Sequence, residues 1–138
     1  MTILNTTPKH QTKFSAGADL ISAEDTIINP NQTVLVSTGY FFSEDVLSKL
    51  QKHNLVVNLH ARSSLAWKKN LLLMNGVGVI DADYKDEIKV MYRNVGLDPV
   101  KLEKGERIAQ LVPLAYVSGI FEVVENERSG GFGSSVSH

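Results

Sequence analysis

Short runs of β-forming residues, each followed by turn residues, dominate this sequence and limit what it can fold into. The predicted strands are residues 33–37, 55–60, 87–93, 107–112 and 120–124. In residues 87–93 apolar and polar residues alternate, so that Ile88, Val90 and Tyr92 lie on one face. Many short strands separated by turns predict an all-β domain, a sandwich or a barrel, rather than a parallel α/β sheet.

Two segments depart from this pattern. Residues 43–52 are the only stretch that we expect to be helical, because Ser43 can cap it, acidic residues occupy its first turn and apolar residues recur at helical spacing. Residues 128–138 are rich in glycine and serine, which predicts a mobile tail. We therefore expect one β domain over residues 1–125 and a flexible C-terminal arm over residues 126–138.

Composition argues against several classes of function. The 138 residues carry a net charge of −1 without a long basic run, which argues against a nucleic-acid-binding groove. The chain has no cysteine, so it has no thiol nucleophile, disulfide or cysteine-ligated metal. Its aliphatic runs are too short to cross a membrane, and its first residues lack the apolar stretch of a signal peptide. We expect a soluble cytoplasmic protein, in the host cytoplasm if its source is viral.

Residues 75–84 are the most informative segment for chemistry. An apolar run with two glycines leads into Asp81 and Asp83, which Tyr84 follows. If the strand continued through them, the two carboxylates would face the same side. Two like charges so close together suit a bound cation or a water molecule that is to be deprotonated. A solvated hairpin tip is the other interpretation, since aspartate is common in turns.

A second cluster of polar residues follows a predicted strand. Arg62 supplies a fork-shaped cation for phosphate oxygens, Ser63 and Ser64 add hydroxyl donors, and Lys68 and Lys69 are close in sequence. The alternative is an ordinary polar strand end.

Three further clusters have a chemical and a structural interpretation. Gln110 stands among apolar neighbours in a predicted strand, where a buried amide needs hydrogen-bond partners. Small residues around Asp19 indicate close backbone contact. In the tail, Arg128 and its neighbouring glycines can bind an anion, and Phe132 can stack on a base. An untethered terminus with a chance aromatic residue is the alternative for the tail.

In this order the clusters resemble the five motifs of the homotrimeric dUTPase family, the deoxyuridine triphosphate pyrophosphatases. The matching segments are residues 16–20, 62–66, 78–84, 105–110 and 128–135. The third and fifth are highly specific, and the match covers most of the chain. The resemblance implies an all-β fold, a jelly-roll-like β barrel, with three active sites at subunit interfaces. There the third motif of one subunit meets the second and fourth of a neighbour, and the arm of the third subunit closes over the nucleotide.

The resemblance also implies a reaction, the hydrolysis of dUTP to dUMP and pyrophosphate, which limits uracil in DNA and supplies dUMP for dTMP synthesis. Asp81 matches the carboxylate that activates the water attacking the α-phosphorus, and Gln110 would help to hold that water. Ser63 would donate a hydrogen bond to the bridging oxygen as pyrophosphate leaves, and Arg62 and Ser64 would contact the phosphates. Mg²⁺ is expected mainly on the substrate phosphates, without a cage of protein ligands.

Other positions match the family's substrate contacts. Those in the domain are Asn75, Gly78, Val79, Ile80, Tyr84 and Lys89, and those in the arm are Arg128, Gly131, Phe132, Gly133, Ser134 and Ser135. The hairpin backbone would read uracil, and Tyr84 would pack against the deoxyribose and exclude a 2′-hydroxyl. Phe132 would stack on the base while Arg128 and the two serines hold the γ-phosphate.

The chain departs from the family pattern at four places. Asp86 stands where glycine is usual, and because aspartate tolerates a left-handed conformation we expect the turn to survive. Ala61 replaces the usual proline before Arg62, and the fifth motif is one residue short after Arg128. The helical stretch at residues 43–52 looks like an insertion, for which the sequence offers no function.

Two other functions stay open at this point. A dCTP deaminase shares the fold and the Arg62 motif, but its family activates water with a glutamate, and no such residue is placed here. A non-catalytic nucleotide sensor would keep the site and bind dUTP without turnover.

Overall fold

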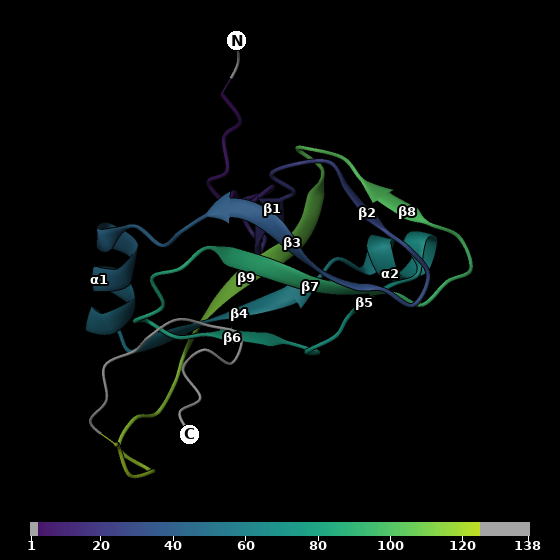
Figure 1. The fold of residues 1–138 in the computed structure, drawn as a ribbon. Coiled ribbons are helices and arrows are strands. Elements are labelled where there is room, and N and C mark those ends of the chain that lie inside the picture. The colour runs from purple at the N-terminus through teal and green to yellow at the C-terminus, as the bar shows by residue number, and fades with distance from the viewer. Residues whose placement is uncertain (1–2, 125–138) are drawn as a thin grey trace.

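The computed structural model describes residues 3–124, which form a β domain with two short helices (Figure 1). In chain order the elements are β1 (Ala18–Ile21), β2 (Thr26–Ile28), β3 (Thr33–Tyr40), α1 (Glu44–Lys52), β4 (Leu55–Ala61), α2 (Ser63–Lys69), β5 (Leu71–Leu73), β6 (Gly78–Ile80), β7 (Ile88–Asn94), β8 (Val100–Leu102) and β9 (Arg107–Ala115). The prediction of an all-β domain is confirmed. No helix in this part of the chain is long and apolar enough to span a membrane.

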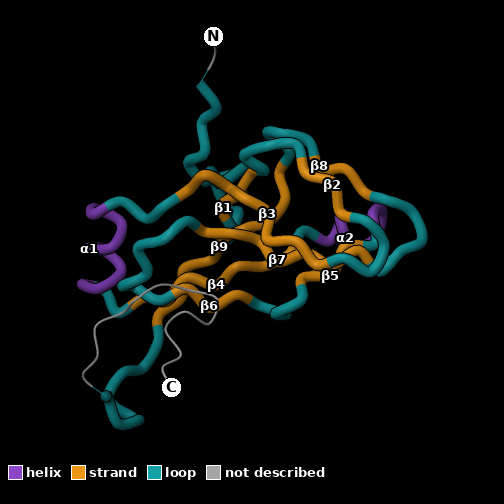
Figure 2. The backbone as a smooth tube through the Cα atoms, in the orientation of Figure 1, coloured by secondary structure: helices purple, strands orange, loops and turns teal. Residues whose placement is uncertain are grey.

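The strands form antiparallel sheets in which neighbours in sequence are seldom neighbours in space. The largest sheet has the order β1-β9-β4-β6, a second has the order β3-β7-β5, and β2 pairs with β8. Figure 2 shows the loops that carry the chain from one sheet to the next. Within residues 3–124 the sheets do not join into one closed barrel. Strand β9 lies between β1 and β4, so it brings three distant parts of the sequence together.

Four of the five predicted strands are confirmed, as β3, β4, β7 and β9. The fifth, residues 120–124, is wrong: these residues form no strand in the described chain, and Phe121 is 86% exposed. After β9 ends at Ala115, the chain runs away from the sheet (Figure 1). An alternating sequence becomes a strand only where another strand offers hydrogen-bonding groups, and this stretch finds none within its own described chain.

The predicted helix is confirmed as α1, but the expectation that it is the only one is wrong. In α1 the Ser43 hydroxyl accepts a hydrogen bond of 3.1 Å from the backbone N–H of Val46, as expected of a cap. The second helix, α2, is seven residues long and buries only Leu65. A helix so short presents no periodic apolar stripe, which is why the sequence did not indicate it.

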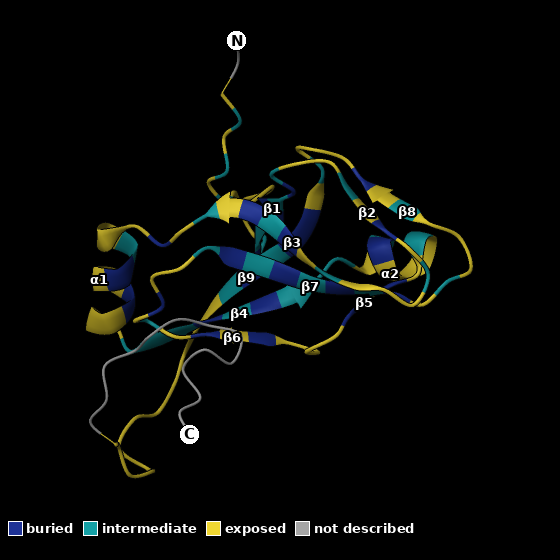
Figure 3. Ribbon diagram, viewed as in Figure 1, coloured by how far each residue is buried: buried dark blue, intermediate teal, exposed yellow. Residues whose placement is uncertain are grey.

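The buried residues gather where the strands of the two larger sheets face the interior (Figure 3). Ile88, Val90 and Tyr92 are 2%, 0% and 0% exposed, so the predicted apolar face of residues 87–93 is confirmed. Helix α1 contributes Leu47 and Leu50 to the same core. This core fixes the strands from whose ends the candidate site is built.

Candidate active site

A cleft of 680 Å³ lies where β1, β4 and β9 run side by side. Its lining includes Gly17, Asp19, His60, Arg62, Ser63, Ser64 and Gln110. The register explains this grouping, because Gln110 of β9 is paired with Asp19 of β1 on one side and with His60 of β4 on the other. Segments 16–20, 62–66 and 105–110 therefore meet in one place within a single chain.

Gln110 lies directly against Gly17. A Cβ atom added to Gly17 would stand 2.3 Å from Gln110 Oε1, closer than real Cβ atoms approach other atoms, and 3.0 Å from Gln110 Cβ. An alanine at position 17 would therefore force the end of the Gln110 side chain to move. The close backbone contact that small residues around Asp19 indicated is present here. Gln110 is half-buried in the cleft wall rather than fully buried.

Arg62 joins the second segment to the fourth. Its Nη1 donates a hydrogen bond of 3.1 Å to the backbone oxygen of Arg107, and the Arg107 guanidinium lies 3.3 Å from Asp19 Oδ2. A guanidinium has five N–H donors, so one bond to the backbone holds Arg62 in place and leaves donors for an anion. The cleft thus has a fixed cation beside the two serine hydroxyls.

Tyr92 supports the strand that carries Gln110, a role that sequence reasoning missed. Its side chain is fully buried, and its hydroxyl donates a hydrogen bond of 2.6 Å to the backbone oxygen of Ile108. Burial raises the pKa of Tyr92 to about 12, although the nearby backbone and charge of Arg62 act in the opposite direction. The signal was a tyrosine rather than a phenylalanine on a buried face, since a buried phenol needs a hydrogen-bond partner.

Asp81 lies far from the cleft in the same chain. Strand β6 runs antiparallel to β4, with Gly78 opposite Leu59 and Ile80 opposite Val57, so Asp81 follows on beside the beginning of β4. Arg62 comes directly after the end of β4. At about 3.3 Å per residue, the six positions along β4 between the level of Asp81 and Arg62 amount to roughly 20 Å. One chain therefore keeps the carboxylate and the cleft apart.

The expectation that Asp81 and Asp83 share one face of a strand is wrong. Strand β6 ends at Ile80, and the backbone N–H of Tyr84 donates a hydrogen bond of 3.1 Å to the backbone oxygen of Asp81, which closes a turn. The period of two applies to extended backbone only, so it does not hold in this turn.

Comparison with known proteins assigns this arrangement to a family. The chain matches the dUTPase family model over residues 5–136. This chain belongs to the dUTPase family. It is 40% identical to the deoxyuridine 5′-triphosphate nucleotidohydrolase of Pseudomonas putida (strain W619), over 95% of this chain and 87% of that protein. The same enzyme of Nautilia profundicola is 38% identical, over 93% of this chain and 89% of that protein. The predicted family and the predicted enzyme class, a dUTP diphosphatase, are confirmed.

Solved dUTPase structures confirm the fold. The dUTPase of Streptococcus mutans has a TM-score of 0.71 at 34% identity, over 91% of this chain and 93% of that chain. A mutant dUTPase from phage phi11 of S. aureus, whose structure shows the coordination of a structural Mg(II) ion, has a TM-score of 0.70 over 87% of this chain and 90% of that one. The latter is only 20% identical, so it bears on the fold alone. The predicted jelly-roll-like fold of the dUTPase family is thus confirmed.

The other dUTPase positions of the domain lie on or near β6, which pairs with β4 and not with β5 or β7, so the hairpin expected at this point does not form in the described chain. Asn75 is exposed, Val79 is 65% exposed, Ile80 is 9% exposed and Lys89 is half-buried. A Cβ at Gly78 would stand 3.1 Å from Leu59 Cβ, so β6 lies tightly against β4.

Tyr84 is only 7% exposed, and its hydroxyl donates a hydrogen bond of 2.8 Å to the backbone oxygen of Glu87. A contact between Tyr84 and deoxyribose therefore stays a prediction. The arm residues Arg128 and 131–135, and the predicted boundary between residues 125 and 126, lie outside the described residues.

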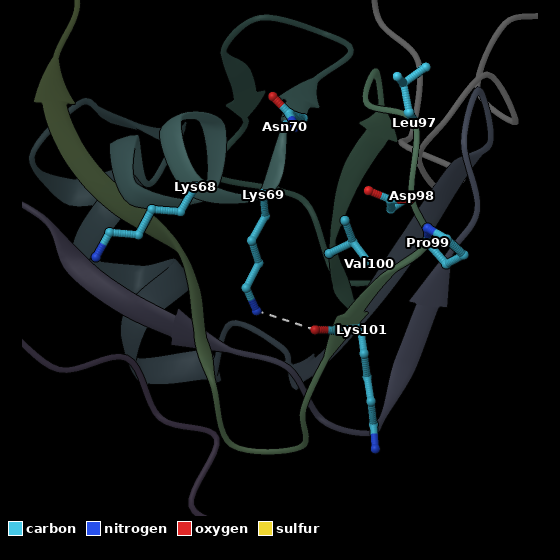
Figure 4. A pocket seen from close by; sticks show the side chains of 8 residues that line it. All are labelled: Lys68, Lys69, Asn70, Leu97, Asp98, Pro99, Val100 and Lys101. Atoms are coloured by element: carbon cyan, nitrogen blue, oxygen red, sulfur yellow. Dashed lines mark hydrogen bonds between the residues drawn. The ribbon is translucent and has the colours of Figure 1, made fainter.

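Two lysines that follow the second motif do not reach the cleft. Lys68 and Lys69 line a separate pocket of 310 Å³, on the side of α2 that faces β8 (Figure 4). Lys69 Nζ donates hydrogen bonds of 3.2 Å to the Lys101 backbone oxygen and 3.0 Å to Glu106 Oε2. The sequence-based idea that these two lysines help Arg62 to bind phosphate is not supported by their positions.

Two departures from the dUTPase pattern have simple structural outcomes. The positive φ angles of non-glycine residues in the described chain belong to Asn31, Asn54 and Asn70. Asp86 is thus not in the left-handed conformation that its replacement of glycine suggested, and the turn does not require a positive φ at this position. Ala61 is the last residue of β4 and is paired with Ala109.

Proposed function

We propose that this chain hydrolyses dUTP to dUMP and pyrophosphate in a site that neighbouring subunits of a homotrimer complete. The observation that carries the proposal is the division of the site: Arg62, Ser63 and Gln110 share a cleft, while Asp81 stands roughly 20 Å away along β4. A single copy cannot bring the carboxylate to the cleft, whereas a symmetric assembly can. The substrate is supported by the names of the relatives, which are dUTP nucleotidohydrolases.

The residues suggest how the reaction would proceed. A neighbour's Asp81 would accept a proton from a water molecule as that water attacks the α-phosphorus in line with the leaving pyrophosphate. Gln110, held on Gly17, would orient the water from the cleft wall. Arg62 would oppose the charge that develops on the phosphate oxygens, and Ser63 would donate to the bridging oxygen, with Ser64 on a neighbouring phosphate.

Selection of the nucleotide would come from the segment before Asp81. The backbone of residues 78–80 and the amide of Asn75 would read the uracil edge, in a pocket too tight for the methyl group of thymine. Tyr84 would exclude ribose. Phe132, with Arg128, Ser134 and Ser135, would close the site from the arm. Lys89 would contact the substrate as well.

Mg²⁺ would neutralise part of the triphosphate charge when bound. Among residues 3–124 no three His, Asp or Glu side chains gather in a way that could hold a metal ion. An ion carried mainly by phosphate and water oxygens, which are ligands that Mg²⁺ prefers, would need no cage of protein carboxylates. The cytoplasm is the proposed location, because a chain without cysteine needs no oxidising compartment.

The first test is pyrophosphate release with Mg²⁺ from dUTP, UTP, dTTP and dCTP by the purified protein. We expect turnover of dUTP alone. Tight dUTP binding without turnover would instead indicate a sensor, and ammonia released from dCTP would indicate a deaminase.

The second test asks whether the site spans subunits. Asp81→Asn and Gln110→Ala are each expected to be nearly inactive, but a site that joins them across an interface can take its aspartate from one variant and its glutamine from the other. In an equal, randomly mixed trimer about one quarter of the sites would be intact, so roughly a quarter of wild-type turnover should return. Native mass spectrometry would verify that mixed trimers have formed. If these trimers stay inactive, the shared site is refuted.

A further inference from the structure

Helix α1, which covers the stretch that looked like an insertion in the family pattern, contacts the turn that carries Asp81. Gln51 Nε2 donates a hydrogen bond of 3.0 Å to the backbone oxygen of Ala82, the residue between the two aspartates. Figure 1 shows α1 beside the loop that joins β6 to β7. The contact links residues that are distant in sequence, and it reaches the backbone of the turn rather than a side chain at its surface.

The local sequence fixes the position from which Gln51 reaches the turn. The Ser43 cap and the acidic first turn set where α1 begins, and Leu47 and Leu50 anchor one face of it in the core. Gln51 is four residues after Leu47, so it lies on the same side of the helix at the border of the buried face. Its side chain is thereby directed along the protein surface toward Ala82, which packs against the core.

The other end of the loop is held as well, by Glu87. The Ser37 hydroxyl and the Gly39 N–H (2.8 Å) both donate hydrogen bonds to Glu87 Oε2. Burial raises the pKa of Glu87, but these hydrogen bonds and the charge of Lys89 together outweigh it, so the pKa is lowered and the group is ionised at neutral pH. The loop between β6 and β7 is thus attached to β3 at its end, and to α1 near its beginning.

We propose that Gln51 is a positioning residue for Asp81: the hydrogen bond from α1 to Ala82 fixes the turn and so sets the place at which the carboxylate meets the attacking water. This inference rests on the proposed function, since it gives α1 a role in the same site. A catalytic group displaced by about 1 Å can lose as much as 100-fold in rate, so loss of this contact should lower kcat rather than weaken substrate binding.

The test compares Gln51→Met with Lys52→Met in the full-length protein. Methionine keeps the length and helix propensity of glutamine but has no donor, and Lys52 is the exposed neighbour of Gln51 on α1. We expect Gln51→Met to lower kcat for dUTP about three- to tenfold, with KM within twofold of wild type, and Lys52→Met to change neither. Amide hydrogen exchange at Tyr84, whose N–H closes the turn, should speed up in Gln51→Met only.

Each outcome decides the proposal. If the wild-type protein is active and kcat is unchanged in Gln51→Met, the positioning role of Gln51 is refuted. The same holds if kcat/KM falls only because KM rises. Unchanged exchange at Tyr84 would also overturn it, because Gln51 would then not hold the turn. If the wild-type protein does not turn over dUTP, the proposed function fails, and the exchange measurement alone still decides whether Gln51 restrains the turn.

Discussion

Replacing Gly17 with alanine should damage catalysis more than folding. The new Cβ would meet Gln110 Oε1 at 2.3 Å, against a normal contact of about 3.5 Å, so the amide must retreat by roughly 1 Å. The end of a glutamine can rotate away, which keeps the cost in stability near the lower end of the usual range for overpacking, about 1 kcal/mol. A water-orienting group moved by about 1 Å, however, can lower kcat as much as 100-fold.

The assay for Gly17→Ala pairs steady-state dUTP turnover with thermal unfolding at one fixed subunit concentration. We expect kcat to fall about 10- to 100-fold, with a decrease in Tm of roughly 3–5 °C. Gly119→Ala is the matched control, because a Cβ there meets nothing within 4 Å and its positive φ of 81° makes alanine costly by itself. That variant should lose stability and keep its kcat.

A double variant shows whether Gln110 transmits the effect. Gln110→Ala removes the Oε1 and Cδ atoms that the new Cβ would meet. In the Gln110→Ala background, Gly17→Ala should therefore lower both kcat and Tm by less than it does in the wild-type protein. Full additivity of the two changes, or wild-type kcat in Gly17→Ala, would refute the argument that Gly17 exists to place Gln110.

Three other predictions concern single residues. Asp81→Asn should lower kcat about 10²- to 10⁴-fold without changing Tm, and near-normal turnover would rule out Asp81 as the base. Tyr92→Phe leaves the Ile108 oxygen without its 2.6 Å donor and should cost about 1–3 kcal/mol in urea unfolding at pH 7. The pKa of Tyr92 is about 12 in the folded protein, against 10.0 for the free group, so the stabilisation is complete below pH 10 and is lost toward pH 12. The difference in unfolding free energy between Tyr92→Phe and wild type should therefore narrow over that range. The pKa of Glu87 is lowered from 4.5, so its stabilisation is present above that pH, and the effect of Glu87→Gln on Tm should disappear as the pH falls below it.

The elements that the sequence predicted correctly are those whose own residues specify them. Residues 87–93 alternate because Ile88 and Tyr92 point into a core while their neighbours do not, and α1 carries both its cap and its buried stripe. Helix α2 escaped prediction because a single buried residue, Leu65, gives no period. Residues 120–124 have the composition of a strand, but a strand also needs a partner, which composition does not record.

For the site, the sequence predicted the chemical groups but not their distances. The carboxylate, the guanidinium and the hydroxyls were identified from motif order and residue type. That Gln110 needs glycine at position 17, or that Gln51 contacts the turn after β6, depends on which side chains face each other across elements far apart in sequence. Tyr92 was placed on the buried face, but its hydrogen bond to Ile108 joins strands β7 and β9, which belong to different sheets.

The sequence by itself thus determined the all-β class, the family and the residues that can do phosphate chemistry, because these follow from local period and from the order of short motifs. Only the tertiary structure decided that Arg62, Ser63 and Gln110 form one cleft while Asp81 lies roughly 20 Å away. The physical reason is that strand pairing and register join distant segments through backbone hydrogen bonds, which are the same for every residue type, and the choice among pairings is made by burial of the whole core.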